Sequence, residues 1–285
     1  LSTFVISGVL SIEPNSDNNV FSVTLNPELE FTFSEQCFEG CNKFVHVHFF
    51  NIRNLKLAES AFYNCSSIEA IDIDSSCKME IQISVFGHCS SLTSIVLPEN
   101  CNVNKANYLF DECENLQSIQ LPTGITEIPI GMFRNCSNLS QVQIGGQDIT
   151  SIESITKIND FAFQNNTNLE WTQLPPKLET IGKQSFENDL KLKVTSFPQS
   201  IKTIGEAAFS NSGLEKIIIQ NVTNNESENQ KVLISNYAFS KCSQLKEAYI
   251  DKSIKCSPTA FSETDVDPYF TNLPPEDFAS CSNMN

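Results

Sequence analysis

The stretches that decide the fold are residues 86–98, FGHCSSLTSIVLP, and residues 110–122, FDECENLQSIQLP. Each begins with Phe and has Cys three residues later, Leu at six, and Ile and Leu at nine and eleven, followed by Pro. With each Phe counted as position zero, the frame recurs along the chain, and Asn, Asp or Ser replaces Cys in some copies. The copies begin at Phe38, Phe62, Phe86, Phe110, Phe133, Phe163, Phe186, Phe209, Phe239 and Phe261, and those at Phe209 and Phe261 are one residue shorter.

Most of these Phe residues are 23 or 24 residues apart, and two intervals stretch to 30. The extra residues fall near 145–157 and 221–231, which are polar and therefore predict inserted loops. We expect residues 1–13 to form an N-terminal cap and residues 14–266 to form about ten coils of 22–24 residues. Residues 267–285 look irregular and begin a coil at Phe278 that Asn285 leaves unfinished, so we expect the array to be truncated there.

The spacing predicts a solenoid. A 23- to 24-residue period with L-x-x-I-x-L in its copies lies in the range of leucine-rich repeats. The last two aliphatic residues alternate with outward ones, so each copy contributes one short strand. Stacked copies then form a parallel sheet on the concave face, because one coil alone cannot bury its apolar side. The Phe and the residue at position three form the convex side, where three-residue spacing predicts single turns or 3₁₀ pieces and a column of stacked rings.

The full pattern, A-F-x-x-C-x-x-L-x-x-I-x-L-P followed by I-x-x-I-G, resembles the BspA-like class of leucine-rich repeats. The segments IKTIGEAAF at 201–209 and LETIGKQSF at 178–186 carry the resemblance most closely. The resemblance implies a cell-surface or secreted protein of the kind found in bacteria and parasitic protists, several of which are adhesins for host proteins.

Composition argues against several other classes of function. The formal net charge is −16 and the only arginines are Arg53 and Arg134, so the chain has no basic cluster for nucleic acid. No stretch approaches 18 apolar residues, so we expect no membrane segment within this sequence. Three His and ten Gly offer neither a nucleophile with its base nor a phosphate loop, and His46 with His48 gives two metal ligands without a third. We therefore expect no enzyme activity, no cofactor and no metal.

The cysteines divide into two groups. The larger group shares position three, which faces the interior, and we expect these thiols to stay reduced and to donate to a carbonyl of a neighbouring coil. Its members are Cys41, Cys65, Cys89, Cys113, Cys136, Cys242 and Cys281. Cys77 and Cys101 each lie nine residues before a Phe, on adjacent coils and at positions we expect to be more exposed. They are a candidate disulfide.

Surface residues remain as the candidate site. Strict alternation along the strands projects one row of side chains onto the concave face, where the only Trp of the chain would be exposed among apolar and polar neighbours. The predicted ligand-binding set is Trp171, Gln143, Gln173, Val194, Ser196, Lys216, Ile218 and Tyr249. Asn221 and Asn225, within the second inserted loop, are the better candidates for glycosylation among several sequons.

These observations favour a non-catalytic, extracellular or cell-surface binding or adhesion protein. It would recognise a protein or a glycan, such as a host surface or matrix protein, through the concave face. The alternative is a cytoplasmic leucine-rich-repeat scaffold for protein–protein interaction.

Overall fold

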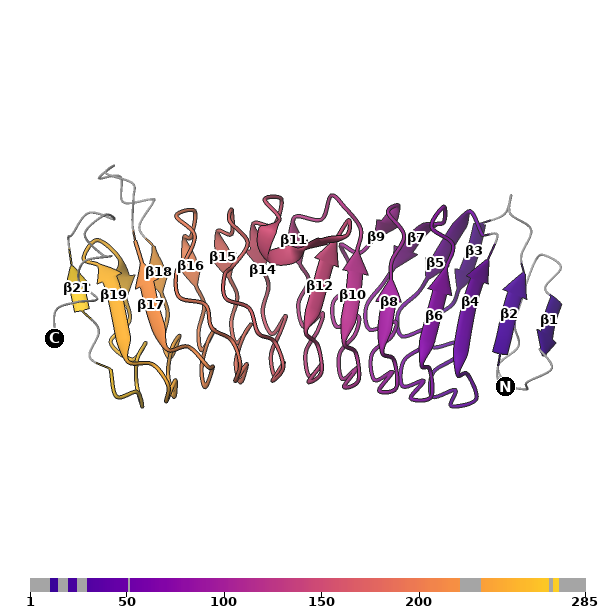
Figure 1. Cartoon of the computed structure of the whole chain (residues 1–285). Helices are drawn as coiled ribbons and strands as arrows, with labels where there is room; N and C mark the ends of the chain where they lie inside the picture. The colour runs from indigo at the N-terminus through magenta and orange to yellow at the C-terminus, as the bar shows by residue number, and fades with distance from the viewer. Residues whose placement is uncertain are drawn as a thin grey trace.

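The computed structural model describes the backbone of residues 11–14, 20–24, 30–50, 52–220, 232–266 and 269–271. Coils of similar shape are stacked along one axis, so β1 and β21, the first and last described strands, lie at opposite ends of the stack (Figure 1). Within the described residues, strands and turns make up each coil, and the one helical element is a short 3₁₀ segment. The predicted leucine-rich-repeat solenoid is confirmed.

The first side of the solenoid carries the L-x-x-I-x-L strands. An eight-stranded sheet has the order β1-β2-β4-β6-β8-β10-β12-β13 and is parallel from β2 to β12. Its strands are β1 (Ser11–Pro14), β2 (Val20–Thr24), β4 (His46–Phe50), β6 (Ala70–Ile73), β8 (Ser94–Val96), β10 (Ser118–Leu121), β12 (Gln141–Ile144) and β13 (Gln147–Asp148). A separate three-stranded sheet, β17 (Lys216–Ile219), β19 (Glu247–Asp251) and β21 (Tyr269–Thr271), continues this side toward the C-terminus. Equivalent positions are aligned from coil to coil, as in Ser94 beside Ser118 and Ser118 beside Gln141.

The second side carries the strands of the linker that precedes each Phe. One sheet comprises β3 (Glu30–Phe33), β5 (Asn54–Leu57), β7 (Lys78–Ile81) and β9 (Cys101–Asn102). The other comprises β11 (Glu127–Ile128), β14 (Lys157–Ile158), β15 (Thr180–Ile181), β16 (Thr203–Ile204), β18 (Leu233–Ile234) and β20 (Lys255–Cys256). Both sheets are parallel, so each coil is tied to its neighbours on this side as well.

The third side is made by turns around the repeated Phe residues. In all of these turns except that of Phe261, the residues two before and two after the Phe have positive φ, as at Ser60 (57°) and Asn64 (57°) around Phe62. Left-handed backbone costs a non-glycine residue about 1–2 kcal/mol. Hydrogen bonds between coils offset that cost, because the N–H groups of Ser60, Phe62 and Asn64 donate to carbonyls of the next coil at 2.8–3.0 Å. The convex side is therefore a series of linked single turns, as the three-residue spacing predicts.

The core is a column of Phe rings between the three sides. Phe86, Phe110, Phe133, Phe163 and Phe186 are fully buried. Successive centroids in this run lie 5.3–6.0 Å apart, and the planes of Phe110 and Phe133 differ by 1°. Buried aromatic pairs of this kind contribute about 0.5–1.5 kcal/mol beyond the apolar area that they bury.

The segment near 145–157 forms a hairpin on the first side. Gly145 and Gly146 have φ of 54° and 79° and join β12 to β13 as a tight turn, a geometry that favours glycine. The 3₁₀ helix η1 (Ile149–Ser151) follows, and the Asp148 carboxylate accepts from the Thr150 N–H at its start. The other predicted loop, 221–231, lies outside the described residues, as do residues 1–10 of the expected cap and most of 267–285. No helix in the described part of the chain has the length and apolar character needed to cross a bilayer.

Candidate ligand-binding face

Side chains at positions eight and ten project outward from the strands β4 to β12. We call this surface the strand face. Position eight contributes His46, Ala70, Ser94, Ser118 and Gln141, and position ten contributes His48, Asp72, Val96, Gln120 and Gln143. All ten side chains are at least partly exposed. Because neighbouring strands are parallel and in register, the two rows run across five coils as continuous lines of polar or small groups.

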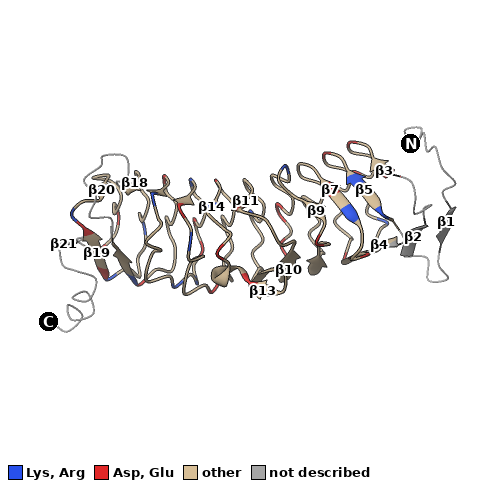
Figure 2. Cartoon of the chain, turned by 90° about the horizontal axis from the view of Figure 1, so that it is seen from above, with Lys and Arg blue, Asp and Glu red and all other residues tan. Residues whose placement is uncertain are grey.

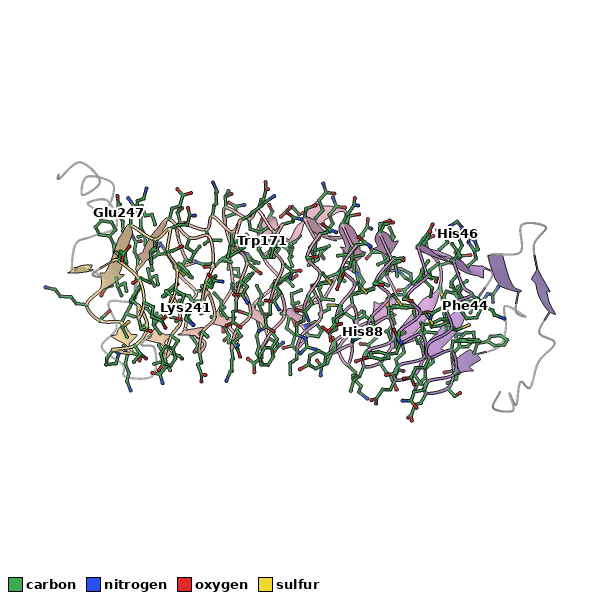
Figure 3. The ribbon with its side chains drawn as sticks, turned by 90° about the horizontal axis from the view of Figure 1, so that it is seen from below. Phe44, His46, His88, Trp171, Lys241 and Glu247 are labelled. Atoms are coloured by element: carbon green, nitrogen blue, oxygen red, sulfur yellow. The ribbon has the colours of Figure 1, made fainter. Side chains whose placement is uncertain are left out.

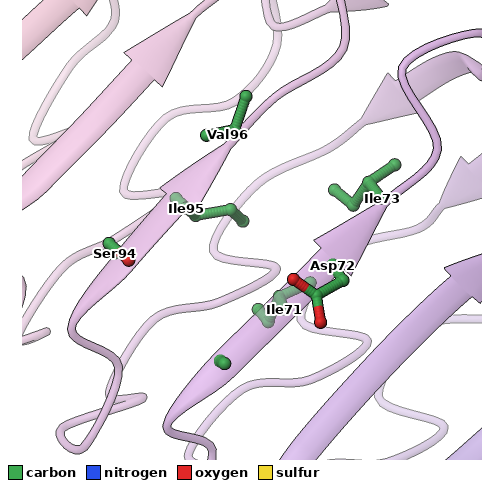
Figure 4. A pocket seen from close by; sticks show the side chains of 7 residues that line it. Ile71, Asp72, Ile73, Ser94, Ile95 and Val96 are labelled. Atoms are coloured by element: carbon green, nitrogen blue, oxygen red, sulfur yellow. The ribbon is translucent and has the colours of Figure 1, made fainter.

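A hollow lies between β6 and β8 on this face (Figure 4). It measures about 460 Å³ and is lined by residues 70–73 and 94–96. The small side chains of Ala70 and Ser94 leave the space open, and Val96, 58% exposed, stands at its border. An exposed aliphatic group beside small polar ones gives this part of the strand face both apolar and hydrogen-bonding contacts for a ligand.

The N-terminal border of the hollow is charged. His48 Nδ1 lies 2.8 Å from Asp72 Oδ2, and His46 Nε2 lies 3.9 Å from Glu69 Oε2. The Asp72 side chain is 57% exposed, whereas that of His48 is 18% exposed. The carboxylate therefore faces solvent at the edge of the hollow while the imidazole supports it from the neighbouring strand.

Two residues of the predicted binding set are not on the surface. Trp171 is only 6% exposed, and its ring packs edge-on against Phe163 at 5.0 Å and Phe186 at 5.9 Å between centroids (Figure 3). Val194 is fully buried in the next coil. The predicted exposure of both side chains is wrong, and the predicted binding set loses its centre.

The physical reason is the residue at position nine. Coils with a strand have an apolar residue there, Ile or Val in most and Ala248 in β19, but these two have Thr172 and Thr195, and both are exposed. Burying a threonine hydroxyl without a partner is costly, so the chain turns the apolar residue at position eight inward instead. That turn removes the alternation on which a strand depends, and neither coil has a strand on this side. The missing aliphatic at position nine is a sequence signal that would have identified Trp171 and Val194 as core residues.

The strand face is consequently divided. Beyond the two strandless coils, Lys216 Nζ lies 2.8 Å from Glu247 Oε2 and 5.3 Å above the centroid of the Tyr249 ring. Ile218 is partly exposed on the same strand as Lys216 and bridges to Ser196. The structure thus brings together Ser196, Lys216, Ile218 and Tyr249 as a C-terminal patch. Gln143 lies on β12, and Gln173 is exposed on the strandless part between them.

The interior cysteine column behaves as predicted. Cys65, Cys89, Cys113 and Cys136 are buried and free. Their thiols donate to the carbonyl of the preceding coil's Phe at 3.0, 3.4, 3.1 and 3.0 Å, respectively. Burial raises the pKa of the Cys65 thiol to about 12, and it also raises the pKa of Cys113 well above its usual range. These groups are neutral hydrogen-bond donors that hold one coil to the next.

The candidate disulfide between Cys77 and Cys101 is not formed, and the expected exposure of both residues is wrong. Both thiols are free, with 0% and 7% of the residue exposed. Each residue closes a turn whose N–H donates three residues back, Cys77 to Asp74 at 3.0 Å and Cys101 to Pro98 at 2.9 Å. These turns direct both side chains into the core, where burial raises the pKa of Cys77 to about 11 and of Cys101 to about 12.

A polar cluster on the turn side was not predicted from the sequence. His88 Nδ1 lies 3.0 Å from Glu112 Oε2, and Arg134 donates to both carboxylate oxygens of Asp111 at 2.8 and 2.6 Å. His88, Asp111 and Glu112 have the side-chain types and proximity of metal ligands. Because Arg134 occupies both oxygens of the buried Asp111, the arrangement is better explained as an ion pair that links two coils. Elsewhere, charged residues are distributed along the solenoid, with no basic stripe among the described residues (Figure 2).

Comparison with known proteins identifies the repeat. The BspA type leucine rich repeat region matches residues 15–139, 106–228 and 156–285. The chain belongs to the BspA-type leucine-rich repeat family. A leucine-rich repeat protein from Bacteroides ovatus has a similar structure, with 18% identity over 92% of this chain and 81% of that one and a TM-score of 0.53. At such identity the likeness concerns the fold.

Two further solved structures resemble the BspA-type chain more distantly. A leucine rich cell surface protein from Faecalibacterium prausnitzii is 18% identical over 97% of this chain and 96% of that one, with a TM-score of 0.39. The pneumococcal vaccine antigen PcpA is 16% identical over 89% of both chains, with a TM-score of 0.45. Comparison with curated protein sequences gave no significant match. Asn221 and Asn225, the candidate glycosylation sites, lie outside the described residues.

Proposed function

We propose that this BspA-type protein is a non-catalytic binding or adhesion protein that recognises a protein or a glycan through the strand face. The observation that carries the proposal is the pair of outward rows on β4 to β12. They present small or uncharged side chains in register from β8 to β12, next to the ion pair of His48 and Asp72, and a hollow opens between β6 and β8. A surface of this kind suits an extended ligand, because a solenoid offers the same position once per coil at roughly 4.8 Å.

The N-terminal part of the strand face is the favoured contact surface. It combines the hydroxyl groups of Ser94 and Ser118 and the amides of Gln120 and Gln141 with the exposed Val96. Such a mixture supplies directional hydrogen bonds together with apolar area, as interfaces with peptides and glycans require. The C-terminal patch of Ser196, Lys216, Ile218 and Tyr249 is a second contact surface on the same side, since it contains an aromatic ring and an amphipathic lysine.

The proposed location is the cell surface or the exterior. Family membership supports this location, because the sequence resemblance associates BspA-type repeats with surface and secreted proteins. Labelling of intact cells of the source organism with an antibody to the chain tests the location. Surface staining without permeabilisation is expected, and staining only after permeabilisation would favour the cytoplasmic scaffold.

A pair of matched substitutions tests the binding surface. Val96→Arg places a long cation over the hollow, whereas Leu233→Arg makes the same kind of change at an exposed aliphatic residue of the second side, 39% exposed on β18. The purified chain and both variants are applied to an array of glycans and immobilised extracellular matrix proteins. Loss of binding by at least about tenfold for Val96→Arg, with Leu233→Arg unchanged, is expected for an interface core. Equal binding by both variants would exclude the hollow as the contact site.

A further inference from the structure

The interior column at position three changes chemistry where the strand face is broken. Along the chain it reads Cys136, Asn166, Asp189, Ser212 and Cys242. Cys136 and Cys242 donate to the Phe carbonyl of the preceding coil at 3.0 Å, and the Asn166 amide donates to the Phe133 carbonyl at 3.0 Å. Position three therefore holds a hydrogen-bond donor in the coil before Asp189 and in the coils of Cys136 and Cys242. The two strandless coils are the ones that carry Asn166 and Asp189.

Asp189 does not fit that pattern as a carboxylate. Asp189 is 0% exposed, and its Oδ1 accepts a hydrogen bond from the Asn166 backbone N–H at 2.8 Å. Its Oδ2 is buried and has no hydrogen-bond partner among the described residues, and the same is true of Asn166 Oδ1. With Asp189 ionised, both unpartnered oxygens are acceptors without a donor. A buried charge with one hydrogen bond and no counter-ion is strongly unfavourable.

We propose that Asp189 is a neutral carboxylic acid in the folded protein and that it forms, with Asn166, a pH-sensitive clamp across the two strandless coils. The proton makes Oδ2 a donor, which is the role of Cys136, Asn166 and Cys242 at position three of their coils. The carboxylic acid of Asp189 thus stands where other coils have a Cys thiol, and it is a stronger hydrogen-bonding group. It lies in a coil that has no strand pairing on the first side. The clamp is independent of the binding function proposed above.

Among the described residues, the surroundings of Asp189 contain no charge that would stabilise the ionised form. On the turn of Asp189 itself, Glu187 accepts from the Gln164 and Gln184 amides, and Lys191 pairs with Glu170 at 3.1 Å in the exposed layer. From the preceding coil the column presents Asn166, and from the following coil Ser212. The nearest titratable groups within the column are the thiols of Cys136 and Cys242, which are two coils away and neutral because burial raises the pKa of each. Burial likewise raises the pKa of Asp189 well above its usual range.

The direction of the pH effect follows from this environment. In the unfolded chain Asp189 ionises near its ordinary pKa of about 3.9. The folded protein retains the proton to a higher pH, so the unfolded state binds fewer protons at neutral pH. The stability that the clamp contributes is therefore complete below about pH 4 and declines as the pH rises toward the pKa of the folded state.

The test compares two isosteric substitutions. Asp189→Asn supplies an amide donor that has no dependence on pH, and Asp265→Asn makes the same substitution at an exposed residue. Thermal unfolding of the wild type and both variants is followed from pH 4 to pH 8. The difference in melting temperature between Asp189→Asn and the wild type should grow by at least about 3 °C, in favour of the variant, from pH 4 to pH 8. One pKa unit corresponds to roughly 2–4 °C in a chain of this size. The melting temperature of Asp265→Asn should depend on pH in the same way as that of the wild type.

Infrared spectroscopy reads the proton directly. At pH 7 the wild type and Asp265→Asn should show a carboxylic-acid C=O band that is missing from Asp189→Asn. If Asp189→Asn fails to fold, Asp189→Ser, which copies Ser212 of the next coil, takes its place in both measurements. Absence of the band in the wild type, or the same pH profile for the Asp189 and Asp265 variants, would overturn the proposal.

Discussion

The coil that begins at Phe110 and the coil that begins at Phe163 have the same length from Phe to Pro but form the first side of the solenoid differently. The Phe110 coil has Ile119 at position nine and forms β10, whereas the Phe163 coil has Thr172 there and forms no strand. In the second coil Trp171 fills the interior from position eight. The Phe ring remains buried in both, so the core column tolerates the change that the sheet does not.

This difference shows what each part of the repeat determines. The Phe, the residue at three and the Leu at six fix the turn side, because they are buried in regular and strandless coils alike. We attribute the presence or absence of a strand on the first side to the residue at nine, because an apolar residue there sets the inward phase of the alternation. Both strandless coils have Thr at that position and an apolar residue, Trp171 or Val194, at position eight.

The largest expected effect comes from removing Trp171, the residue at position eight that fills the interior in place of an aliphatic residue at position nine. Trp171→Ala should lower the free energy of unfolding by about 3–5 kcal/mol, because it leaves a cavity between Phe163 and Phe186. Urea denaturation measures the change. The matched control, Gln143→Ala on the strand face, should cost less than about 0.5 kcal/mol. A silent Trp171→Ala would mean that the ring is on the surface.

A second substitution pair should convert a strandless coil to a regular one. Val194→Ser alone should cost about 1–3 kcal/mol, because it puts a hydroxyl in the core. Adding Thr195→Ile should recover part of that loss, since the double variant has the regular order of outward and inward residues and can pair as a strand with β17. Denaturation of the two single variants and the double variant gives the coupling energy. Additive losses would contradict the role assigned to position nine.

The cysteine column offers a smaller test in the regular coils. Cys113→Ala should cost about 1–2 kcal/mol, because the carbonyl of Phe86 loses its donor and a small cavity forms. Alkylation gives an independent measurement by mass spectrometry. Cys65, Cys89, Cys113 and Cys136 should resist labelling at pH 8 in the native protein, because burial keeps their thiols neutral, and should all label in denaturant without reductant. A requirement for reductant would show that they are oxidised.

The smallest effect is expected at the exposed ion pairs between coils. Lys202 Nζ lies 2.6 Å from Glu179 Oε2, and both side chains are largely exposed. Lys202→Ala should change the free energy of unfolding by less than about 0.5 kcal/mol, and the change should shrink further in high salt. Arg134→Ala is the contrasting variant, because it leaves the buried carboxylate of Asp111 without its partner and should cost several times more. Equal losses would show that burial does not govern these pairs.

Much of this architecture could be predicted from the sequence, and the errors have definite causes. The period, the turns with left-handed residues such as Asn64 and the thiol-to-carbonyl bonds follow from spacing and residue type. The position of Trp171 was predicted wrongly because strict alternation was applied to a coil that lacks the aliphatic residue at nine. Burial of Cys77 and Cys101 depends on turns that aim the chain inward, and spacing alone does not specify that direction. The hollow beside Ser94 depends on side chains of neighbouring coils together, so no single repeat indicates it.

The most direct test uses the fluorescence of Trp171, because it is the only Trp in the chain. The central claim is that loss of the aliphatic residue at position nine brings position eight into the core. Native protein should therefore emit at shorter wavelength than unfolded protein and should resist quenching by acrylamide, with both properties lost together on denaturation. Native emission at the unfolded wavelength, with quenching as efficient as in denaturant, would contradict the claim.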